Sequence, residues 1–134
     1  EVKVVAYNKD GKAVAEKTVR TAGKPHHIEL VSNRNELTAD GKDLAYVTVK
    51  VVDKDGNLCP TDSRLIHFSV KGAGKFRAVA NGDPTNLEQF HLPKMHAFHG
   101  MLTAIVQAGE IAGDLVLTAK ASGVKTGTVH LQAK

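Results

Sequence analysis

The stretch that decides the fold class of this chain is Leu44-Ala45-Tyr46-Val47-Thr48-Val49-Lys50-Val51-Val52. Its valines at 47, 49 and 51 alternate with Tyr46, Thr48 and Lys50. Successive side chains of a β-strand point to opposite faces, so this alternation places the valines on a buried face and the polar residues on a solvated one. The stretch therefore predicts a strand that is half buried in a sheet.

The same period of two recurs along the chain, for example at Ile66-His67-Phe68-Ser69-Val70, where Phe68 is expected to point into the core. Asp-Gly steps and other glycine- or proline-containing turns separate the periodic segments. The predicted strands are 2–7, 13–20, 26–32, 45–52, 65–70, 75–80, 100–107, 114–121 and 126–132. Short strands at this spacing predict an all-β, immunoglobulin-like Greek-key β-sandwich of about seven to nine strands.

The first two predicted strands form a hairpin, which a glycine- and proline-containing break separates from the rest. An isolated hairpin is marginally stable in water. We therefore expect residues 1–23 to be the terminal hairpin of a preceding domain, or a linker, and residues 24–134 to form the sandwich domain. A chain that opens directly on a strand is also expected to be part of a longer protein.

Composition argues against several classes of function. The 134 residues carry a formal charge of +4, but the basic residues are spread along the chain rather than clustered. No nucleic-acid partner is therefore expected. Apolar runs of the length needed to cross a bilayer are absent, so no membrane insertion is expected. Only 4% of the residues are aromatic and none is Trp, which counts against a stacking platform for sugars.

Catalytic and metal-binding motifs are missing from the sequence. The single cysteine, Cys59, follows a turn where it is expected to be accessible, but no neighbouring base would activate it. His91, His96 and His99 lie close together at spacings that match no zinc motif, so neither a metal nor another cofactor is expected. Most carboxylates fall in turns, and no pair suited to glycoside hydrolysis is evident. No catalytic residue is predicted.

One long connection, from Asn81 to Phe98, contains two prolines and shows no clear period. Loops of this length in compact domains are commonly functional or form interfaces. As candidate interdomain or ligand-facing residues we select Asn81, Asp83, Phe90, Phe98 and His99. On the sheet itself, Tyr46 is expected to point outward and is the best candidate for stacking against a sugar.

Several motifs resemble a known module from Gly23 onward. The segments 28–30, 37–49 and 52–57, which include Leu37-Thr38-Ala39-Asp40-Gly41, are similar to an invasin-type immunoglobulin repeat. Asn81-Gly82-Asp83-Pro84-Thr85, followed by Phe98-His99-Gly100, resembles the C-terminal accessory domain of glycoside hydrolase family 2, as in bacterial β-galactosidases. The segment 91–96 departs from that pattern, which puts the contacts of this loop in question.

The resemblance implies a non-catalytic module near the C-terminus of an exo-acting, retaining galactosidase. The catalytic glutamates of such enzymes lie in a TIM barrel, so none can be assigned here. The implied partners are the other domains of the parent glycosidase, with carbohydrate as a further possible ligand, and the implied location is periplasmic or secreted. Two alternatives stay open, namely a carbohydrate-binding module and an adhesin-type immunoglobulin-like repeat.

Overall fold

The computed structural model describes residues 2–9, 11, 13–19 and 23–134, which form eleven strands and no helix. In chain order the strands are β1 (Val2–Tyr7), β2 (Ala13–Val19), β3 (His27–Ser32), β4 (Glu36–Leu37), β5 (Leu44–Val52), β6 (Leu65–Gly72), β7 (Gly74–Ala80), β8 (Lys94–His96), β9 (Met101–Ala108), β10 (Gly113–Lys120) and β11 (Gly127–Ala133). The described residues contain no helix that could span a bilayer.

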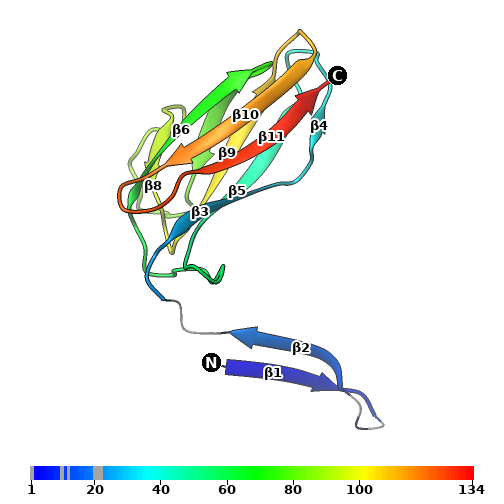
Figure 1. Ribbon diagram of the computed structural model, residues 1–134, viewed down its shortest axis with the longest axis vertical. Helices are drawn as coiled ribbons and strands as arrows, with labels where there is room; N and C mark the ends of the chain where they lie inside the picture. The colour runs from blue at the N-terminus through cyan, green and yellow to red at the C-terminus, as the bar shows by residue number, and fades with distance from the viewer. Residues whose placement is uncertain (1, 10, 12, 20–22) are drawn as a thin grey trace.

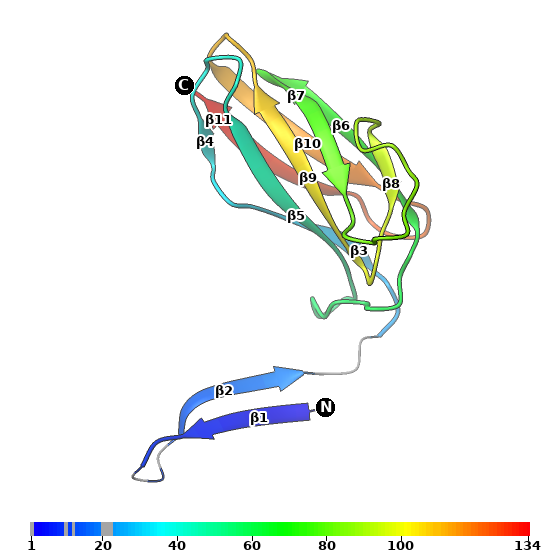
Figure 2. The ribbon, with the colours of Figure 1, turned by 180° about the vertical axis from the view of Figure 1, so that it is seen from behind.

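Two sheets face each other and form a sandwich (Figures 1 and 2). One has the order β4-β11-β10-β6-β8 and the other the order β3-β5-β9-β7. All neighbouring strands are antiparallel except β11 and β4. The chain passes repeatedly from one sheet to the other, for example between β5 and β6. The predicted immunoglobulin-like sandwich is thus confirmed.

The core lies between the two sheets and is formed by the residues that the period of two placed inside. Val47, Val49 and Val51 of β5 are fully buried, as are Leu115 and Leu117 of β10. The prediction that Phe68 faces inward is also confirmed, since it is 6% exposed and stacks on Phe76 with ring centroids 5.9 Å apart. Burial of such β-branched and aliphatic side chains is the main favourable term for a domain of this kind.

Two short strands were not predicted. Strand β4 has two residues and β8 has three, and neither is long enough to show a hydrophobic period. The prediction that 81–98 is a connection without regular structure was therefore wrong in part. The segment crosses from β7 in one sheet to the edge of the other, where β8 pairs with β6. Met95 of β8 is fully buried and anchors this crossing in the core.

Strands β1 and β2 pair only with each other and form a separate two-stranded sheet, with Val2 opposite Val19 (Figure 1). Asp10 of the predicted Asp-Gly turn, Arg20 at the end of the predicted strand 13–20, and residues 21 and 22 of the predicted break lie outside the described residues. The division of the chain at residue 23 stays a prediction.

Candidate functional site

The long connection begins with a turn that its own side chains hold in place. The side-chain amide of Asn81 donates to the carbonyl oxygen of His96 (2.9 Å), and its Oδ1 accepts from the backbone N–H of Asp83 (3.0 Å). Oδ1 of Asp83 in turn accepts from the hydroxyl (2.7 Å) and the backbone N–H (2.9 Å) of Thr85. These bonds lower the pKa of Asp83. Asn81 and Asp83 therefore shape the loop.

The connection ends in a tight two-residue turn at Phe98-His99-Gly100-Met101. Phe98 and Met101 exchange both backbone hydrogen bonds at 3.1 Å. His99 and Gly100 have φ values of 53° and 75°. Positive φ at both central positions is the hallmark of the type I′ hairpin turn, which suits the twist of antiparallel strands. The Phe-His-Gly motif thus has a geometric cause, because glycine adopts this conformation without strain.

Three of the five selected loop residues meet in one open hollow of about 450 Å³. Asn81, Phe98 and His99 line it together with residues of β7 and β9, including Ala80, Met101 and Thr103. The Phe98 and His99 rings contact each other, with centroids 4.0 Å apart. Asp83 and Phe90 do not line the hollow. Phe90 is 56% exposed, while its carbonyl oxygen accepts from the N–H of Val79 (2.8 Å) and holds the loop against β7.

The loop brings no hydrolytic pair of carboxylates together. Asp83 is engaged by Thr85, and the carboxylate of Glu88 contacts Nδ1 of His96 at 3.1 Å. His99 instead lies near the carbonyl oxygen of Pro60 (3.4 Å). Within the described ranges, no group of three or more His, Cys, Asp or Glu side chains is placed to hold a metal ion.

Cys59 is buried, at 4% exposed, so the expectation of an accessible thiol was wrong. The segment after the Asp55-Gly56 turn folds back, and the N–H of Cys59 donates to the carbonyl oxygen of Val51 (2.9 Å). Burial, with the nearby Asp53 and Asp62 carboxylates, raises the pKa of the thiol. Because the thiolate is the nucleophilic form, Cys59 is a packing residue.

Tyr46 lies on the outer face of the four-stranded sheet and is 46% exposed. Its cross-strand neighbour is Ile105, not a second aromatic ring. The backbone N–H of Tyr46 donates to Oδ1 of Asn33 (2.9 Å), which ties β5 to the end of β3. A single exposed ring beside an aliphatic residue offers one stacking surface, whereas sugar sites draw on several polar and aromatic groups.

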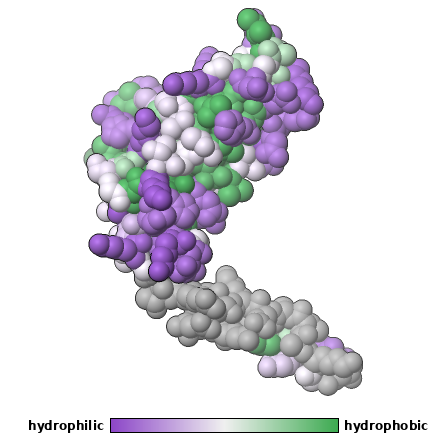
Figure 3. Space-filling view, in the orientation of Figure 1, coloured by the Kyte–Doolittle hydropathy of each residue, from purple (hydrophilic) through white to green (hydrophobic). Residues whose placement is uncertain are grey.

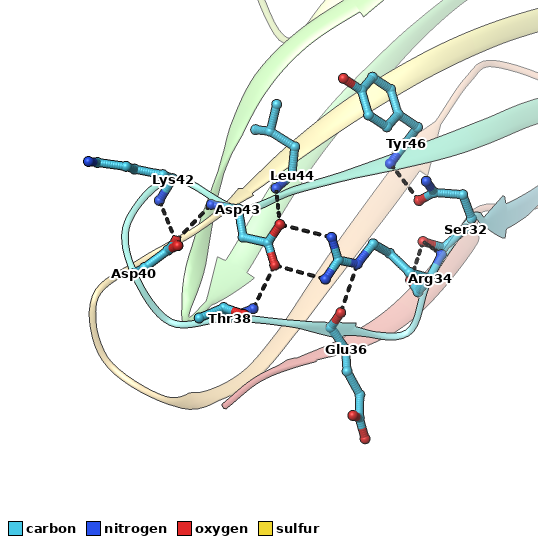
Figure 4. Close-up of polar contacts among 10 residues, drawn as sticks. Ser32, Arg34, Glu36, Thr38, Asp40, Lys42, Asp43, Leu44 and Tyr46 are labelled. Carbon is cyan, nitrogen blue, oxygen red and sulfur yellow. Dashed lines mark hydrogen bonds and ion pairs between the residues drawn. The ribbon is translucent and has the colours of Figure 1, made fainter.

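An ion-pair network beside Tyr46 was not predicted (Figure 4). The Arg34 guanidinium donates to both carboxylate oxygens of Asp43, at 2.8 and 2.9 Å, and Oδ2 of Asp43 also accepts from the N–H of Thr38 (2.7 Å). The Thr38 bond, with the charge of Arg34, lowers the pKa of Asp43. The network fixes the segment that contains β4 and connects β3 to β5. Arg34 and Asp43 are nine positions apart in the sequence, so no local pattern indicated the pair.

The structural role of Asp53 was not predicted either, because the residue lies in a turn where aspartate is common. Asp53 is 3% exposed, and its carboxylate accepts from the backbone N–H groups of Gly23 (2.9 Å), Asp55 (3.0 Å) and Asn57 (2.8 Å). The Asn57 side-chain amide donates a further bond at 3.2 Å. The bond from Gly23 and those from Asn57 lower the pKa of Asp53 to about 2. Asp53 thus joins the end of the break at Gly23 to the sandwich.

The lowered pKa of Asp53 predicts a pH dependence of folding. The folded-state pKa of about 2 lies below the ordinary value of 3.8, so ionised Asp53 stabilises the fold above about pH 4, and this contribution is lost as pH falls toward 2. Asp53→Asn should be less stable than the wild type at neutral pH, and the gap should close in that window. Urea unfolding at a series of pH values measures it. A gap that stays constant with pH would contradict the assignment.

Residues 28–130 match the family model of glycoside hydrolase family 2 C-terminal domain 5. The chain belongs to this family. The resemblance drawn from the Asn-Gly-Asp-Pro-Thr and Phe-His-Gly motifs is therefore confirmed, and the two motifs lie at the two ends of one loop. In this family 2 domain the first motif is a side-chain-bonded turn and the second is a hairpin turn.

The family 2 relatives are much longer proteins. The beta-galactosidase BoGH2A of Bacteroides ovatus is 44% identical over 133 residues, which are 99% of this chain and 16% of that protein. A glycosyl hydrolase family 2 member from Bacteroides cellulosilyticus superposes with a TM-score of 0.91 at 32% identity, covering 98% of this chain and 17% of that one. A beta-glycosidase from Bacteroides vulgatus gives 0.94 at 26% identity, with the same coverage. This chain spans less than a fifth of each.

Likeness to adhesins is limited to the fold. Adhesin InvE of Yersinia pseudotuberculosis superposes on 78% of this chain, and on 26% of its own length, with a TM-score of 0.51 at 22% identity. The likeness shows a shared sandwich architecture, and the invasin-type resemblance of the sequence stays a prediction. Likeness of fold alone does not transfer function.

Proposed function

We propose that this domain is a non-catalytic accessory module of a family 2 β-galactosidase and docks on other domains of the parent enzyme. The observation that carries the proposal is the outer face of the four-stranded sheet, hereafter the docking face (Figure 2). Its two central cross-strand rows pair uncharged residues and are Val31-Thr48-Thr103-Ala80 and Tyr46-Ile105-Ala78. The exposed Arg77 occupies the bulge of β7 beside Ala78.

The outer face of an antiparallel sheet is usually polar where it meets water. Here Val31 is 52% exposed and Tyr46 is 46% exposed, and the charges of Glu29 and Lys50 lie one row further out. Depletion of charge at the centre with polar residues around it is typical of a protein–protein interface. The docking face therefore favours a protein surface as its partner.

The docking face continues into the hollow of the long loop, because Ala80 and Thr103 belong to both. Along the loop, Leu87 is 96% exposed and Phe90 is 56% exposed. Neighbouring apolar side chains that remain in water commonly mark an interaction site. The interface proposed for the parent enzyme thus comprises the docking face and the loop from Asn81 to His99.

A carbohydrate-binding role is supported less well. It would rest on separate exposed rings such as Tyr46 on the sheet, Tyr7 on the hairpin and Phe90 on the loop, because Phe68 and Phe76 pack together inside the sandwich. The glutamates that the reaction of a retaining galactosidase requires would lie in the parent's barrel. The domain would act by holding or covering that barrel.

A charge placed on the docking face tests the proposal. We expect Thr103→Glu in the full-length galactosidase to weaken the interdomain contact by about 3 kcal/mol, because it buries an unpaired carboxylate. The matched control is Thr126→Glu, which places the same charge on an exposed threonine directly before β11. Differential scanning calorimetry and galactoside kinetics measure domain docking, KM and kcat.

Three outcomes of these measurements support or contradict the proposed function. Early melting or a raised KM for Thr103→Glu alone, with kcat little changed, supports docking by this face. Identical behaviour of both variants and the wild type would rule the face out as an interface. Galactoside hydrolysis by the 134-residue chain alone would contradict the non-catalytic assignment.

A further inference from the structure

The outer face of the five-stranded sheet differs sharply from the docking face. Strand register places Lys120 of β10, His67 of β6 and Lys94 of β8 side by side in one row. Another row joins Lys71 of β6 to Val116 and then His130. We call the surface between and including these rows the basic face.

The row between them consists of hydroxyl side chains. Ser69 lies opposite Thr118, which in turn lies opposite Thr128. Ser69 and Thr128 are exposed, and in the part of the chain that the structure describes none of the three hydroxyls has a hydrogen-bond partner. Figure 3 looks onto this side of the molecule, where pale residues lie among purple hydrophilic ones.

No carboxylate lies within the basic face, and Asp114 and Glu36 occupy the next row outward, on either side of Gln132. None of the three rows contains a carboxylate, and no carboxylate among the described residues forms an ion pair with Lys71, Lys94 or Lys120. Lys94 and Lys120 lie on either side of His67, and Lys71 lies opposite the uncharged Val116. An anionic ligand would supply the opposite charge that these lysines lack.

We propose that the basic face binds an acidic polysaccharide, with its carboxylates on the lysines and its hydroxyls on the central row. The face lies on an extended sheet, so it suits a polymer that crosses several strands. The unpartnered hydroxyls of Ser69, Thr118 and Thr128 match the sugar hydroxyls between successive carboxylates. Buried protein interfaces are depleted of lysine at their centres, which makes a protein partner less favourable here than on the docking face.

The test is a calorimetric titration of the 134-residue chain with polygalacturonate, with neutral galactan and polyglutamate as comparison polymers. We expect polygalacturonate to bind and galactan not to bind. The triple variant Lys71→Gln, Lys94→Gln, Lys120→Gln should weaken binding about tenfold or more, because three charge contacts are lost. The matched control is Lys42→Gln, Lys54→Gln, Lys75→Gln, which removes the same charge from exposed lysines outside the basic face.

A second variant distinguishes the binding of an acidic glycan from the binding of any other polyanion. Ser69→Ala with Thr128→Val keeps every charge, and we expect it to weaken polygalacturonate about threefold while leaving polyglutamate unaffected. Equal losses of affinity for polygalacturonate in the two lysine triple variants would show that binding depends only on net charge, and would overturn the proposal. So would an absence of polygalacturonate binding, or polyglutamate binding that is as tight as that of polygalacturonate. Circular dichroism confirms that each variant is folded.

Discussion

We expect Met95→Ala to lower the free energy of unfolding of this domain by about 2–5 kcal/mol, the range for truncation of a fully buried large side chain. Met95 is 0% exposed and is the buried residue of the three-residue strand β8. Its sulfur contacts the side-chain amide of Asn86 at 3.5 Å. Truncation would leave a cavity where the long loop is anchored, so both the core and the loop should loosen.

The chain contains a matched control for this substitution. Met101 begins β9 and is 36% exposed, so Met101→Ala should cost less than about 1 kcal/mol. Urea unfolding gives the two free energies, and amide hydrogen exchange at Lys94–His96 reports on the loop. Equal losses for the two variants would show that β8 does not depend on its buried side chain.

Gly100→Ala is expected to have an effect of similar size, about 2–6 kcal/mol, for a different reason. Gly100 has φ of 75°, and a Cβ atom there would overlap the carbonyl oxygen of Cys59. Neither the turn at Gly100 nor the segment around Cys59 can move freely to avoid this overlap. The N–H of Gly100 donates to the carbonyl oxygen of Asp62 (3.0 Å), and its own carbonyl oxygen accepts from the N–H of Val51 (2.8 Å).

Gly56→Ala separates the two causes of the lower stability expected for Gly100→Ala, which are the strain of a positive φ and the overlap of the new Cβ with a carbonyl oxygen. Gly56 has φ of 84°, but no atom lies within 4 Å of the position that a Cβ would occupy. Its replacement should therefore cost only the conformational strain, about 1–2 kcal/mol. Thermal or urea unfolding of both variants measures the difference. If Gly100→Ala were no worse than Gly56→Ala, the close approach of the Cys59 carbonyl would not constrain the turn.

The sequence was sufficient for the long strands and insufficient for the short ones. All nine predicted strands are present, because an alternation of apolar and polar residues over six or more positions fits a strand and not a helix. Strands β4 and β8 were missed because only their pairing with β11 and β6 defines them. The Phe98-His99-Gly100 turn was noticed as a motif. Its cause was not evident, since His-Gly is not among the usual hairpin dipeptides.

The candidate site was predicted in part. Of the residues selected from the long connection, Asn81, Phe98 and His99 line one hollow, and their functional role stays a prediction. Asp53 lies in a turn, and its carboxylate also accepts from the N–H of Gly23, thirty residues earlier in the chain. A bond of that kind leaves no local trace, because any aspartate before a glycine turn looks the same in the sequence.

By itself the sequence determined the class of fold, the identity of the buried valines and the shortage of aromatic rings, since each depends on composition or on neighbours within one strand. Only the tertiary structure decided how the surfaces differ. Lys71, Lys94 and Lys120 are widely separated in the sequence and looked like scattered charges, yet strand register places them on one face. The physical reason is that a sheet joins distant strands by backbone hydrogen bonds, and their register depends on how the whole core packs.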